Sequence, residues 1–308
     1  MIQHPSLNVH VMRGANVESQ HLVSAIVVDS QNNTRISWGH TETKIYPRSS
    51  IKPIQALAVI LTGALAKFKI SDQELALACA SHNGENKHVD VVASWLNRMN
   101  LSVLDFECGV HLPSNPKASA SLLKQNKELT AIYNNCSGKH AGFLAMALAM
   151  GVNTQGYVQM NHPVQRLIRE VIEDFCSEKI SESDIAIDGC SIPTYFLPMK
   201  NLALAMARLV DPMELPEKYH EASRKIYQVY VENPFYIAGT DRYCTRMTTA
   251  LQKKALVKTG AEGVMFASLL DQRLGVVVKA HDGASRAAEA AMSWILKELG
   301  LLSDLDWE

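Results

Sequence analysis

Short strands are predicted at both ends of this chain, with a long run of helices between them. Apolar and β-branched residues form strand-like runs at 7–11, 22–29 and 34–39, and again at 263–269 and 274–279. Helical periodicity fills the middle and returns in an alanine-rich segment at 285–299. The pattern predicts an α/β (α+β) fold. In it, an antiparallel sheet built from N- and C-terminal strands is flanked by helices, beside a mostly helical second lobe.

Three short motifs follow one another along this frame. They are Ser49-x-x-Lys52, Ser81-x-Asn83 and Lys258-Thr259-Gly260. In this order, Ser-x-x-Lys, Ser-x-Asn and Lys-Thr-Gly are the motifs of serine enzymes that use lysine in place of a Ser-His-Asp triad. One Ser-x-x-Lys is expected about once by chance in a chain of this length, and Ser114 and Ser121 also begin one. The ordered trio therefore carries the signal, and it indicates catalysis.

The first motif pairs a serine with a candidate base. A serine hydroxyl is a weak nucleophile until a base removes its proton. Lysine is such a base only when neutral, and burial or a nearby cation lowers its pKa from about 10.4. Lys52 precedes the apolar run 54–60, and Lys258 would supply the second cation. Three residues make about one helical turn, so Ser49 and Lys52 are expected on one face; Pro53 allows this only in a first turn.

Each motif also has a purely structural interpretation. Ser49 and Lys52 could be a helix N-cap followed by a solvated lysine. The segment 81–84 follows an apolar helix, and it could aim the Ser81 hydroxyl and the Asn83 amide into a cleft, or simply cap that helix with a left-handed glycine. The segment 258–260 could be a plain turn. For Ser49, the ordered trio favours catalysis.

Two thiols, a lysine, a histidine and a carboxylate form a second group of candidates. Cys136, Lys139 and His140 begin a helix of small and apolar residues, and Asp188 and Cys190 follow a short strand. The two cysteines could hold zinc, with one of the other three residues completing the site, although the spacing matches no common zinc ribbon or finger. From the residues alone, two buried free thiols are the favoured interpretation. The carboxylate could instead bind a substrate ammonium.

Composition and charge narrow the partners and the compartment. The 308 residues carry a formal net charge of −1 and no basic run interleaved with aromatics, so no nucleic-acid partner is expected. No apolar stretch reaches membrane-spanning length, so no membrane partner is expected either. Six cysteines in a chain without a visible secretory signal suggest reduced thiols and a cytoplasmic location.

The lobes are expected to divide the chain unevenly. We expect one catalytic unit over 1–308, with 1–50 and 240–308 forming the sheet lobe and 51–239 the mainly helical lobe. The three motifs lie where these lobes would meet, and a site at such a junction draws residues from both sides.

Taken together, five sequence blocks resemble a known family, the asparaginase II family of rhizobial-type L-asparaginases. The blocks are Arg48-Ser49-Ser50-Ile51-Lys52-Pro53, Ala80-Ser81-His82-Asn83-Gly84-Glu85, Asn135-Cys136-Ser137-Gly138-Lys139-His140, Asp188-Gly189-Cys190-Ser191 and Lys258-Thr259-Gly260-Ala261-Glu262-Gly263. The resemblance spans nearly the whole chain. It implies a fold similar to that of serine β-lactamases, penicillin-binding proteins and glutaminases.

The resemblance also implies an activity and a set of roles. The implied reaction is hydrolysis of L-asparagine to L-aspartate and ammonia, in a protein that commonly forms homodimers. Two serine–lysine pairs carry over, Ser49 with Lys52 and Ser81 with Lys258. A metal site, usually zinc, carries over to Cys136, Lys139 and Cys190. The candidate substrate-binding residues are Arg48, Asn83, His140 and Asp188, with the arginine facing the α-carboxylate.

Three competing functions remain open from the sequence. A glutaminase or another small-amide hydrolase would need only a slightly different pocket, because one methylene separates the two substrates by about 10–200-fold. A penicillin-recognising serine hydrolase shares the trio, but such enzymes normally carry a signal segment. An amino-acid-binding regulatory protein could keep the fold without turnover, although damaged motifs would then be expected.

Overall fold

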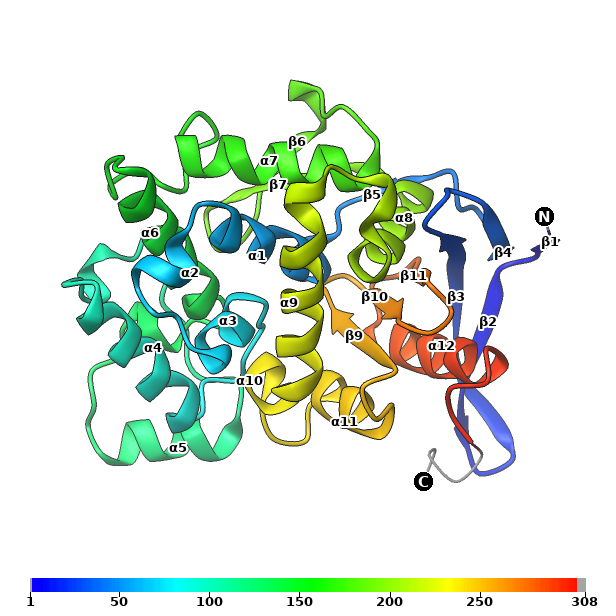
Figure 1. Ribbon diagram of the computed structural model, residues 1–308. Coiled ribbons are helices and arrows are strands. Elements are labelled where there is room, and N and C mark those ends of the chain that lie inside the picture. Colours follow the sequence, from blue (N-terminus) through cyan, green and yellow to red (C-terminus); the bar gives the residue numbers. More distant parts are fainter. Residues whose placement is uncertain (1, 304–308) are drawn as a thin grey trace.

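One mixed sheet forms the spine of the molecule, for which a computed structural model describes residues 2–303. Its strand order is β1-β4-β3-β11-β10-β9, and β2 pairs with β3 outside this path (Figure 1). The strands are β1 (Ile2–His4), β2 (Leu7–Arg13), β3 (Asn16–Asp29), β4 (Thr34–Trp38), β9 (Ala255–Thr259), β10 (Val264–Leu269) and β11 (Leu274–Ala280). The predicted antiparallel sheet from both chain ends is confirmed, except that β1 pairs with β4 in parallel.

The two halves of the chain meet where β3 pairs with β11. Val27 lies opposite Val276, and Ile26 lies opposite Val277. Successive residues of a strand point to opposite faces, and here Ile26 and Val277 join the core that contains the helical part, whereas Val27 and Val276 face the other side. All four side chains are fully buried or nearly so, so both faces of the sheet must be covered.

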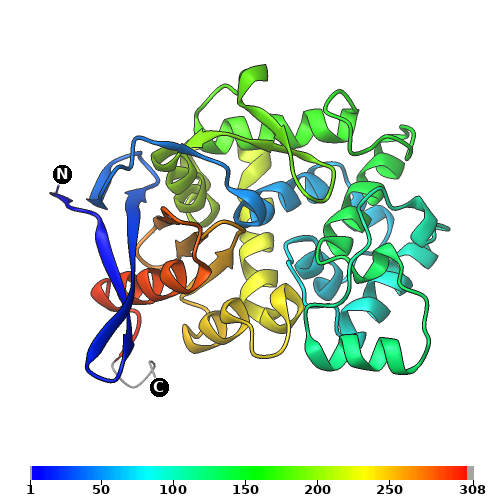
Figure 2. The same cartoon turned by 180° about the vertical axis from the view of Figure 1, so that it is seen from behind.

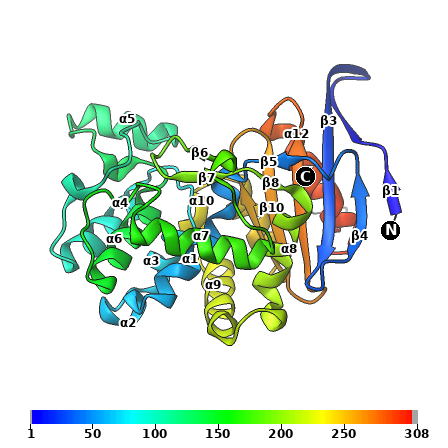
Figure 3. The same cartoon turned by 90° about the horizontal axis from the view of Figure 1, so that it is seen from above.

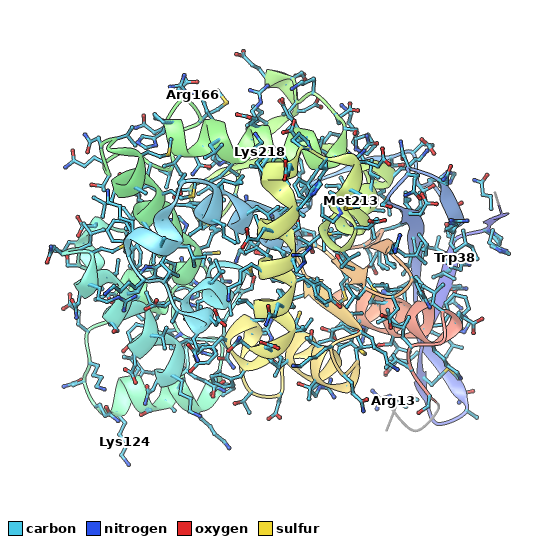
Figure 4. The ribbon with its side chains drawn as sticks, viewed as in Figure 1. Arg13, Trp38, Lys124, Arg166, Met213 and Lys218 are labelled. Atoms are coloured by element: carbon cyan, nitrogen blue, oxygen red, sulfur yellow. The ribbon has the colours of Figure 1, made fainter. Side chains whose placement is uncertain are left out.

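Two helices cover the two faces of the sheet. α8 (Met199–Val210) packs against β3, β10 and β11 on one face, and α12 (Ser285–Glu298) packs against the same strands on the other. The approach of α8 depends on Gly275, because a Cβ there would lie 1.9 Å from the carbonyl oxygen of Ala203. On the far side, Trp38 of β4, which is labelled in Figure 4, meets Trp294 of α12 edge-on at 5.6 Å between ring centroids.

The remaining helices form a large helical part beside the sheet (Figures 2 and 3). They are α1 (Lys52–Leu61), α2 (Ala64–Lys67), α3 (Asp72–Ala78), α4 (Asn86–Arg98), α5 (Pro116–Lys124), α6 (Ser137–Met150), α7 (Pro163–Cys176), α9 (His220–Glu232), α10 (Pro234–Ala238) and α11 (Tyr243–Ala250). Six 3-10 helices join them, η1 (Arg48–Ile51), η2 (Val103–Asp105), η3 (Ala131–Tyr133), η4 (Glu182–Asp184), η5 (Pro212–Glu214) and η6 (Glu217–Tyr219). Within residues 2–303, no helix combines the length and apolar character that crossing a membrane requires.

Two small sheets lie outside the main sheet. β5 (Lys44–Ile45) pairs with β8 (Leu197–Pro198), and β6 (Ile185–Ile187) pairs with β7 (Pro193–Tyr195). The first sheet fixes the segment that runs directly into η1, and the second holds the turn 188–192. Short strand pairs therefore anchor two of the predicted motif regions, the segment 48–53 after β5 and the segment 188–191 between β6 and β7.

Some boundaries differ from those that the sequence pattern predicts. The helical pattern expected in the middle of the chain is interrupted at Gly63, whose φ of +75° starts the separate helix α2. The helix α8 falls in the range assigned to the helical lobe, yet it packs on the sheet because its small residues fit against Gly275. The lobes thus interleave along the chain between residues 199 and 250.

Candidate active site

The first motif lies where η1 runs into α1. Arg48 and Ser49 belong to η1, and Lys52 is the first residue of α1. Pro53 follows within the first turn, where its missing N–H leaves no hydrogen bond unmade. This placement confirms the expectation that the proline is compatible with the motif only at a helix start. Ser49 is partly exposed, whereas Lys52 is buried.

The Lys52 ammonium is hydrogen-bonded to the second motif. Its Nζ donates to Ser81 Oγ at 3.0 Å and to Cys136 Sγ at 3.1 Å, and a third bond goes to the carbonyl oxygen of Ala80. Three acceptors match the three N–H groups of an ammonium. Between Ser49 Oγ and Lys52 Nζ, both in the described part of the chain, the structure has no hydrogen bond.

Ser81 lies between two lysines, one from helix α1 and one from strand β9. Its Oγ is 3.0 Å from Lys52 Nζ and 2.9 Å from Lys258 Nζ. Lys258 is the fourth residue of β9, and it is fully buried. The backbone of the serine is fixed by a bond from its N–H to the carbonyl oxygen of Ile237. The structure thus brings three of the four predicted catalytic residues into one hydrogen-bonded chain.

Burial changes the proton affinity of Lys258. Removal from water, with Lys52 and Arg242 adding like charge, lowers the pKa of Lys258 to about 7, although Cys244 opposes the shift. A substantial fraction of this amine is therefore neutral near pH 7. The neutral amine can accept the Ser81 proton, which is the property that the sequence analysis required of a lysine base.

Asn83 is held by a group of residues at the end of α10. Its side-chain amide donates to Glu85 at 2.7 Å, and Glu85 also accepts from the N–H of Thr240 at 2.7 Å. A Cβ at Gly239 would lie 2.2 Å from Asn83 Oδ1, so only glycine permits this close packing. The Oδ1 atom itself is buried and has no partner in the described structure.

Arg48 and Asp188 form an ion pair next to Ser49. The Arg48 Nη2 atom lies 2.8 Å from Asp188 Oδ1, and its Nε lies 3.0 Å from the same oxygen. Burial raises the pKa of Asp188, but the hydrogen bond and charge of Arg48 outweigh it and hold that pKa below the usual value. The arginine has a left-handed φ of +50°, a conformation that non-glycine residues adopt at a cost of about 1–3 kcal/mol.

Two cavities meet at Arg48. The smaller, beside Ser49, Lys52 and Asp188, measures about 10 Å³, which is about the volume needed for one water. The larger measures about 470 Å³ and lies between the segment 40–48 and the sheet. An amino acid could enter the larger cavity directly, but it could reach Ser49 only if the lining side chains moved.

The three predicted metal ligands, Cys136, Lys139 and Cys190, lie close together in the structure, and Lys139 lines the small cavity beside Arg48 and Asp188. Cys136 and Cys190 share a hydrogen bond, and Lys139 Nζ donates to Cys190 Sγ at 2.9 Å. The helix α6 that carries Lys139 starts close to α3, because a Cβ at Gly138 would lie 2.5 Å from the carbonyl oxygen of Leu77. Among the described residues, no group of three or more His, Cys, Asp or Glu side chains is placed to hold a metal.

The pKa values of Cys136 and Cys190 are shifted in opposite directions. The hydrogen bond from Cys190 and the charges of Lys139 and Lys52 hold the pKa of Cys136 well below its ordinary value, although burial opposes this. The same contact and burial raise the pKa of Cys190. Burial tends to lower the pKa of Lys139, but the two sulfurs outweigh it and raise that pKa. These shifts favour a thiolate at Cys136, a thiol at Cys190 and an ammonium at Lys139.

His140 lies on α6 one turn beyond Cys136, and it is fully buried. Its Nδ1 is 2.7 Å from the hydroxyl of Tyr157, and its Nε2 has no hydrogen-bond partner in the described structure. Tyr157 was not a candidate in the sequence analysis. It belongs to an irregular loop, and neither motif nor periodicity singles it out there.

The fold and this site together indicate a class of enzyme. An α/β fold in which a buried serine lies between two lysines, beside a second serine at a helix start, is typical of serine–lysine hydrolases. The family model for L-asparaginase II matches residues 9–308, and the chain belongs to the L-asparaginase II family. This membership supports an amidohydrolase. No curated protein matches the chain.

The chain is also similar to solved structures at low sequence identity. A protein named Mglu, in its native form, is 13% identical with a TM-score of 0.51, over 92% of this chain and 65% of that chain. The chain thus spans just under two thirds of the length of this protein. A Bacillus glutaminase is 10% identical, covering 91% of both chains with a TM-score of 0.42. A β-lactamase from Mycobacterium bovis is 12% identical with a TM-score of 0.43, over 90% of this chain and 94% of that one.

Proposed function

We propose that this protein is an L-asparaginase, which hydrolyses L-asparagine to L-aspartate and ammonia by acyl transfer to a serine. The observation that carries the proposal is the chain Lys52–Ser81–Lys258, in which a serine hydroxyl bridges two buried amines within hydrogen-bond distance. Membership of the L-asparaginase II family supports the choice of an amide as substrate.

The Arg48–Asp188 pair supports a free α-amino acid as the substrate. Its guanidinium and carboxylate lie side by side at the mouth of the small cavity. An α-amino acid carries the complementary carboxylate and ammonium on one carbon. The substrate would enter from the larger cavity and exchange the internal ion pair for two pairs of its own, which places its side-chain amide near Ser49. A blocked amino or carboxyl group would lose one of these pairs.

Ser49 is the proposed nucleophile because, of the two candidate serines, it is the one that lines a cavity in the described structure. Lys52 first passes a proton through the Ser81 hydroxyl to neutral Lys258. The resulting neutral Lys52 amine takes the proton of Ser49 as its oxygen bonds to the amide carbon. The proton then goes to the leaving nitrogen, the C–N bond breaks, and ammonia departs. Water hydrolyses the aspartyl ester with the same amine as base.

The contact between Ser49 and Lys52 that this step needs must form when substrate binds. Catalytic hydrogen bonds in substrate-free structures are often long and tighten only in the complex. Lys52 has four side-chain torsions, and rotation at its end would exchange the bond to Cys136 for one to Ser49. Ser81, already bonded to both amines, is the competing candidate for the nucleophile.

Two serine variants separate these assignments. We expect Ser49→Ala to lower kcat for asparagine by roughly 10⁴-fold or more, as for loss of a catalytic serine elsewhere, with an unchanged melting temperature. Ser81→Ala should also be impaired, because the proton path is broken. Trapping of the acyl-enzyme and mass spectrometry of the labelled peptide would identify the nucleophile. Near-full activity of Ser49→Ala would transfer the role to Ser81.

Ammonia release from asparagine and from glutamine tests the substrate directly. We expect a higher kcat/KM for asparagine, although the two amides differ by one methylene and discrimination of this kind is about 10–200-fold. A preference for glutamine would make the protein a glutaminase. Hydrolysis of nitrocefin would favour a penicillin-recognising enzyme, and binding of amino acids without ammonia release would favour a regulatory protein.

Zinc is the proposed metal for Cys136, Lys139 and Cys190. Thiolate sulfur and neutral amine nitrogen are suitable donors for zinc, and the three side chains already lie in one group. Bound there, zinc would supply a fixed positive charge for substrate positioning. Binding must release the protons of Cys190 and Lys139, since only their deprotonated forms are ligands.

Metal analysis of the purified protein checks this proposal. We expect about one zinc per chain, and loss of the metal in Cys136→Ser and Cys190→Ser. Cys176→Ser is a matched control, because this thiol is equally buried but lies at the end of α7. A metal-free protein that keeps full activity in the presence of a chelator would argue against the site.

The expected homodimer and the cytoplasmic location remain predictions. Analytical ultracentrifugation over a range of concentrations would test the first, and fractionation of the source cells would test the second.

A further inference from the structure

A second large cavity lies outside the candidate active site. It measures about 690 Å³, against about 470 Å³ for the cavity at Arg48, and the two share no lining residue. Helices α8 and α9, which lie side by side (Figures 1 and 3), form two of its walls, and the turn between β10 and β11 forms a third. Ligand sites in proteins typically measure about 300–1,000 Å³. This cavity is therefore large enough for a small molecule, and the proposed reaction does not use it.

Apolar side chains form much of the lining. Leu209 of α8 and Val231 of α9 are buried at the cavity. Tyr227 contributes its ring, because its hydroxyl donates to the carbonyl oxygen of Lys253 at 3.0 Å. Met213, which is labelled in Figure 4, and Leu270 also line it, and they are 69% and 40% exposed. Large apolar side chains that are exposed beside an apolar cavity are typical of a surface that binds another molecule.

Two arginines line the same cavity with guanidinium groups that have little to bind. Arg224 of α9 has neither a hydrogen bond nor an ion pair from its side chain within residues 2–303. Arg273, in the turn between β10 and β11, has one long ionic contact, of 3.9 Å from its Nη1 to Asp211 Oδ2. That oxygen already accepts a hydrogen bond from Ser30 Oγ at 2.6 Å. Both guanidinium groups therefore keep N–H donors for a further acceptor.

The other ionisable groups of the lining are occupied. Lys253 and Glu232 form an ion pair with each other at 2.9 Å. His220 Nε2 donates to the carbonyl oxygen of Leu215 at 2.9 Å. The lining thus has an excess of unmatched positive charge. A guanidinium presents its donors in a planar fork, and this geometry fits the paired oxygens of a carboxylate or a phosphate.

We propose that this cavity binds a small amphipathic anion, whose carboxylate or phosphate is held by Arg224 and Arg273 and whose apolar chain or ring packs between α8 and α9. The two kinds of lining match the two parts of such a molecule. An anion without an apolar body would gain only screened contacts, because both arginines are exposed. An uncharged apolar molecule would leave the guanidinium groups unmatched. The inference does not rest on the proposed amide hydrolysis, because no lining residue takes part in it.

Isothermal titration calorimetry with the intact protein tests the ligand class. We expect saturable binding of octanoate or octyl phosphate, and the tighter of the two assigns the head group. Acetate has the charge without the chain, and octyl glucoside has the chain without the charge, so each should bind about tenfold more weakly or less. Absence of saturable binding for both octyl anions would overturn the proposal, and so would equal affinity for octyl glucoside.

A double arginine variant tests the location. Arg224→Gln combined with Arg273→Gln should weaken binding of the tighter anion by about tenfold or more, since hydrogen bonds to a charged group are lost. Both side chains are exposed, so the melting temperature should be unchanged. The matched control combines Arg166→Gln with Lys124→Gln, two exposed positions of α7 and α5 that are labelled in Figure 4 and lie outside this cavity. Both double variants lose the same net charge. Equal affinity in the two would place the anion elsewhere, for example at Arg48, and would overturn the site.

A leucine variant tests the apolar part. Leu270→Ser should weaken binding of the same anion by about threefold or more, because the chain loses part of its apolar contact. Leu104→Ser is the matched control, since Leu104 is 91% exposed and lies outside the cavity. Unchanged affinity in Leu270→Ser would contradict the packing of the chain in this cavity. These measurements decide the proposal whatever the protein hydrolyses, because none of them uses an amide substrate.

Discussion

Lys258 brings an ionisable amine into an apolar interior, and this single side chain links stability to activity. Burial is the main reason that its pKa falls from 10.5 to about 7. Between these two values the unfolded chain holds a proton that the native protein has released. Stability therefore rises with pH from about 7 towards 10.5 on account of this residue, and below 7 the full penalty of the buried charge is present.

Lys258→Met should be strongly impaired and yet at least as stable as the wild-type protein. Methionine fills a similar volume without a charge, so the desolvation penalty disappears, while loss of the proton acceptor should lower kcat by about 10²–10⁴-fold. The stability of wild-type protein should increase between pH 6 and 8.5, and that of the variant should increase less. Thermal unfolding at several pH values measures this. An equal slope in both proteins would contradict the assigned pKa.

The pH profile of the wild-type enzyme should show the same group. Lys258 must be neutral to accept a proton, so kcat/KM should fall as the pH drops through about 7. The limb should be absent from the residual activity of Lys258→Met. A profile that stays flat from pH 8 to pH 5.5 would rule out this lysine as the acceptor.

At this scale the sequence predicted which residues meet but not how they pair. Lys52, Ser81 and Lys258, which motif order had grouped, are joined by hydrogen bonds in the structure. Local spacing suggested that Lys52 would face Ser49, and in the structure it faces Ser81. Spacing along a helix fixes where a side chain starts, whereas a lysine has four rotatable bonds, and its end goes to the acceptors that tertiary packing supplies. Tyr157 carried no signal, because its contact with His140 depends wholly on such packing.

At the scale of elements, the contact of α8 with the sheet is the closest that the backbone allows. Gly275 on β11 has no room for a side chain, since a Cβ would lie 1.9 Å from the Ala203 carbonyl oxygen and 2.5 Å from the Ala207 nitrogen. The contact is backbone against backbone, so neither side can yield by changing a rotamer.

Gly275→Ala should therefore destabilise the protein by about 1–3 kcal/mol or more, the range for overpacked cores. Chemical denaturation with urea measures the change. Gly109→Ala is the matched control, because nothing lies within 4 Å of the Cβ position there and its φ is not left-handed. Similar losses in the two variants would show that conformational effects of alanine, not the α8 contact, dominate.

Element prediction succeeded for the closing helix and for most strands of the main sheet, and it failed for several short elements. The closing helix α12 lies close to its predicted range, 285–299. The strands β1 and β9 and the helices α10 and α11 were not predicted. Such segments hold their structure through contacts with distant parts of the chain, and no local periodicity records those contacts.

At the scale of the whole molecule, the sheet and the helical part share one core. The largest group of packed apolar residues includes Ile26 and Phe266 of the sheet together with Trp95 and Phe143 of the helical part. A continuous core of this kind leaves no boundary at which one part could unfold alone. The sequence predicted two lobes from the order of its strands and helices, but their shared interior depends on how these elements dock.

We therefore expect a single unfolding transition. Differential scanning calorimetry should give one peak whose calorimetric and van't Hoff enthalpies agree. Far-ultraviolet circular dichroism should report the same midpoint. Two resolved transitions, or a midpoint that differs between the methods, would show that the lobes unfold independently.

The pairing of β3 with β11 has a consequence for how the protein is made. Asp29 leaves the ribosome early, but its partner Leu274 is translated 245 residues later, since 274 − 29 = 245. At a translation rate of about 5–20 residues per second, β3 is synthesised roughly 10–50 s before its partner strand β11. During translation it exposes an apolar strand edge, which favours recruitment of a chaperone and makes a prematurely terminated product prone to aggregate.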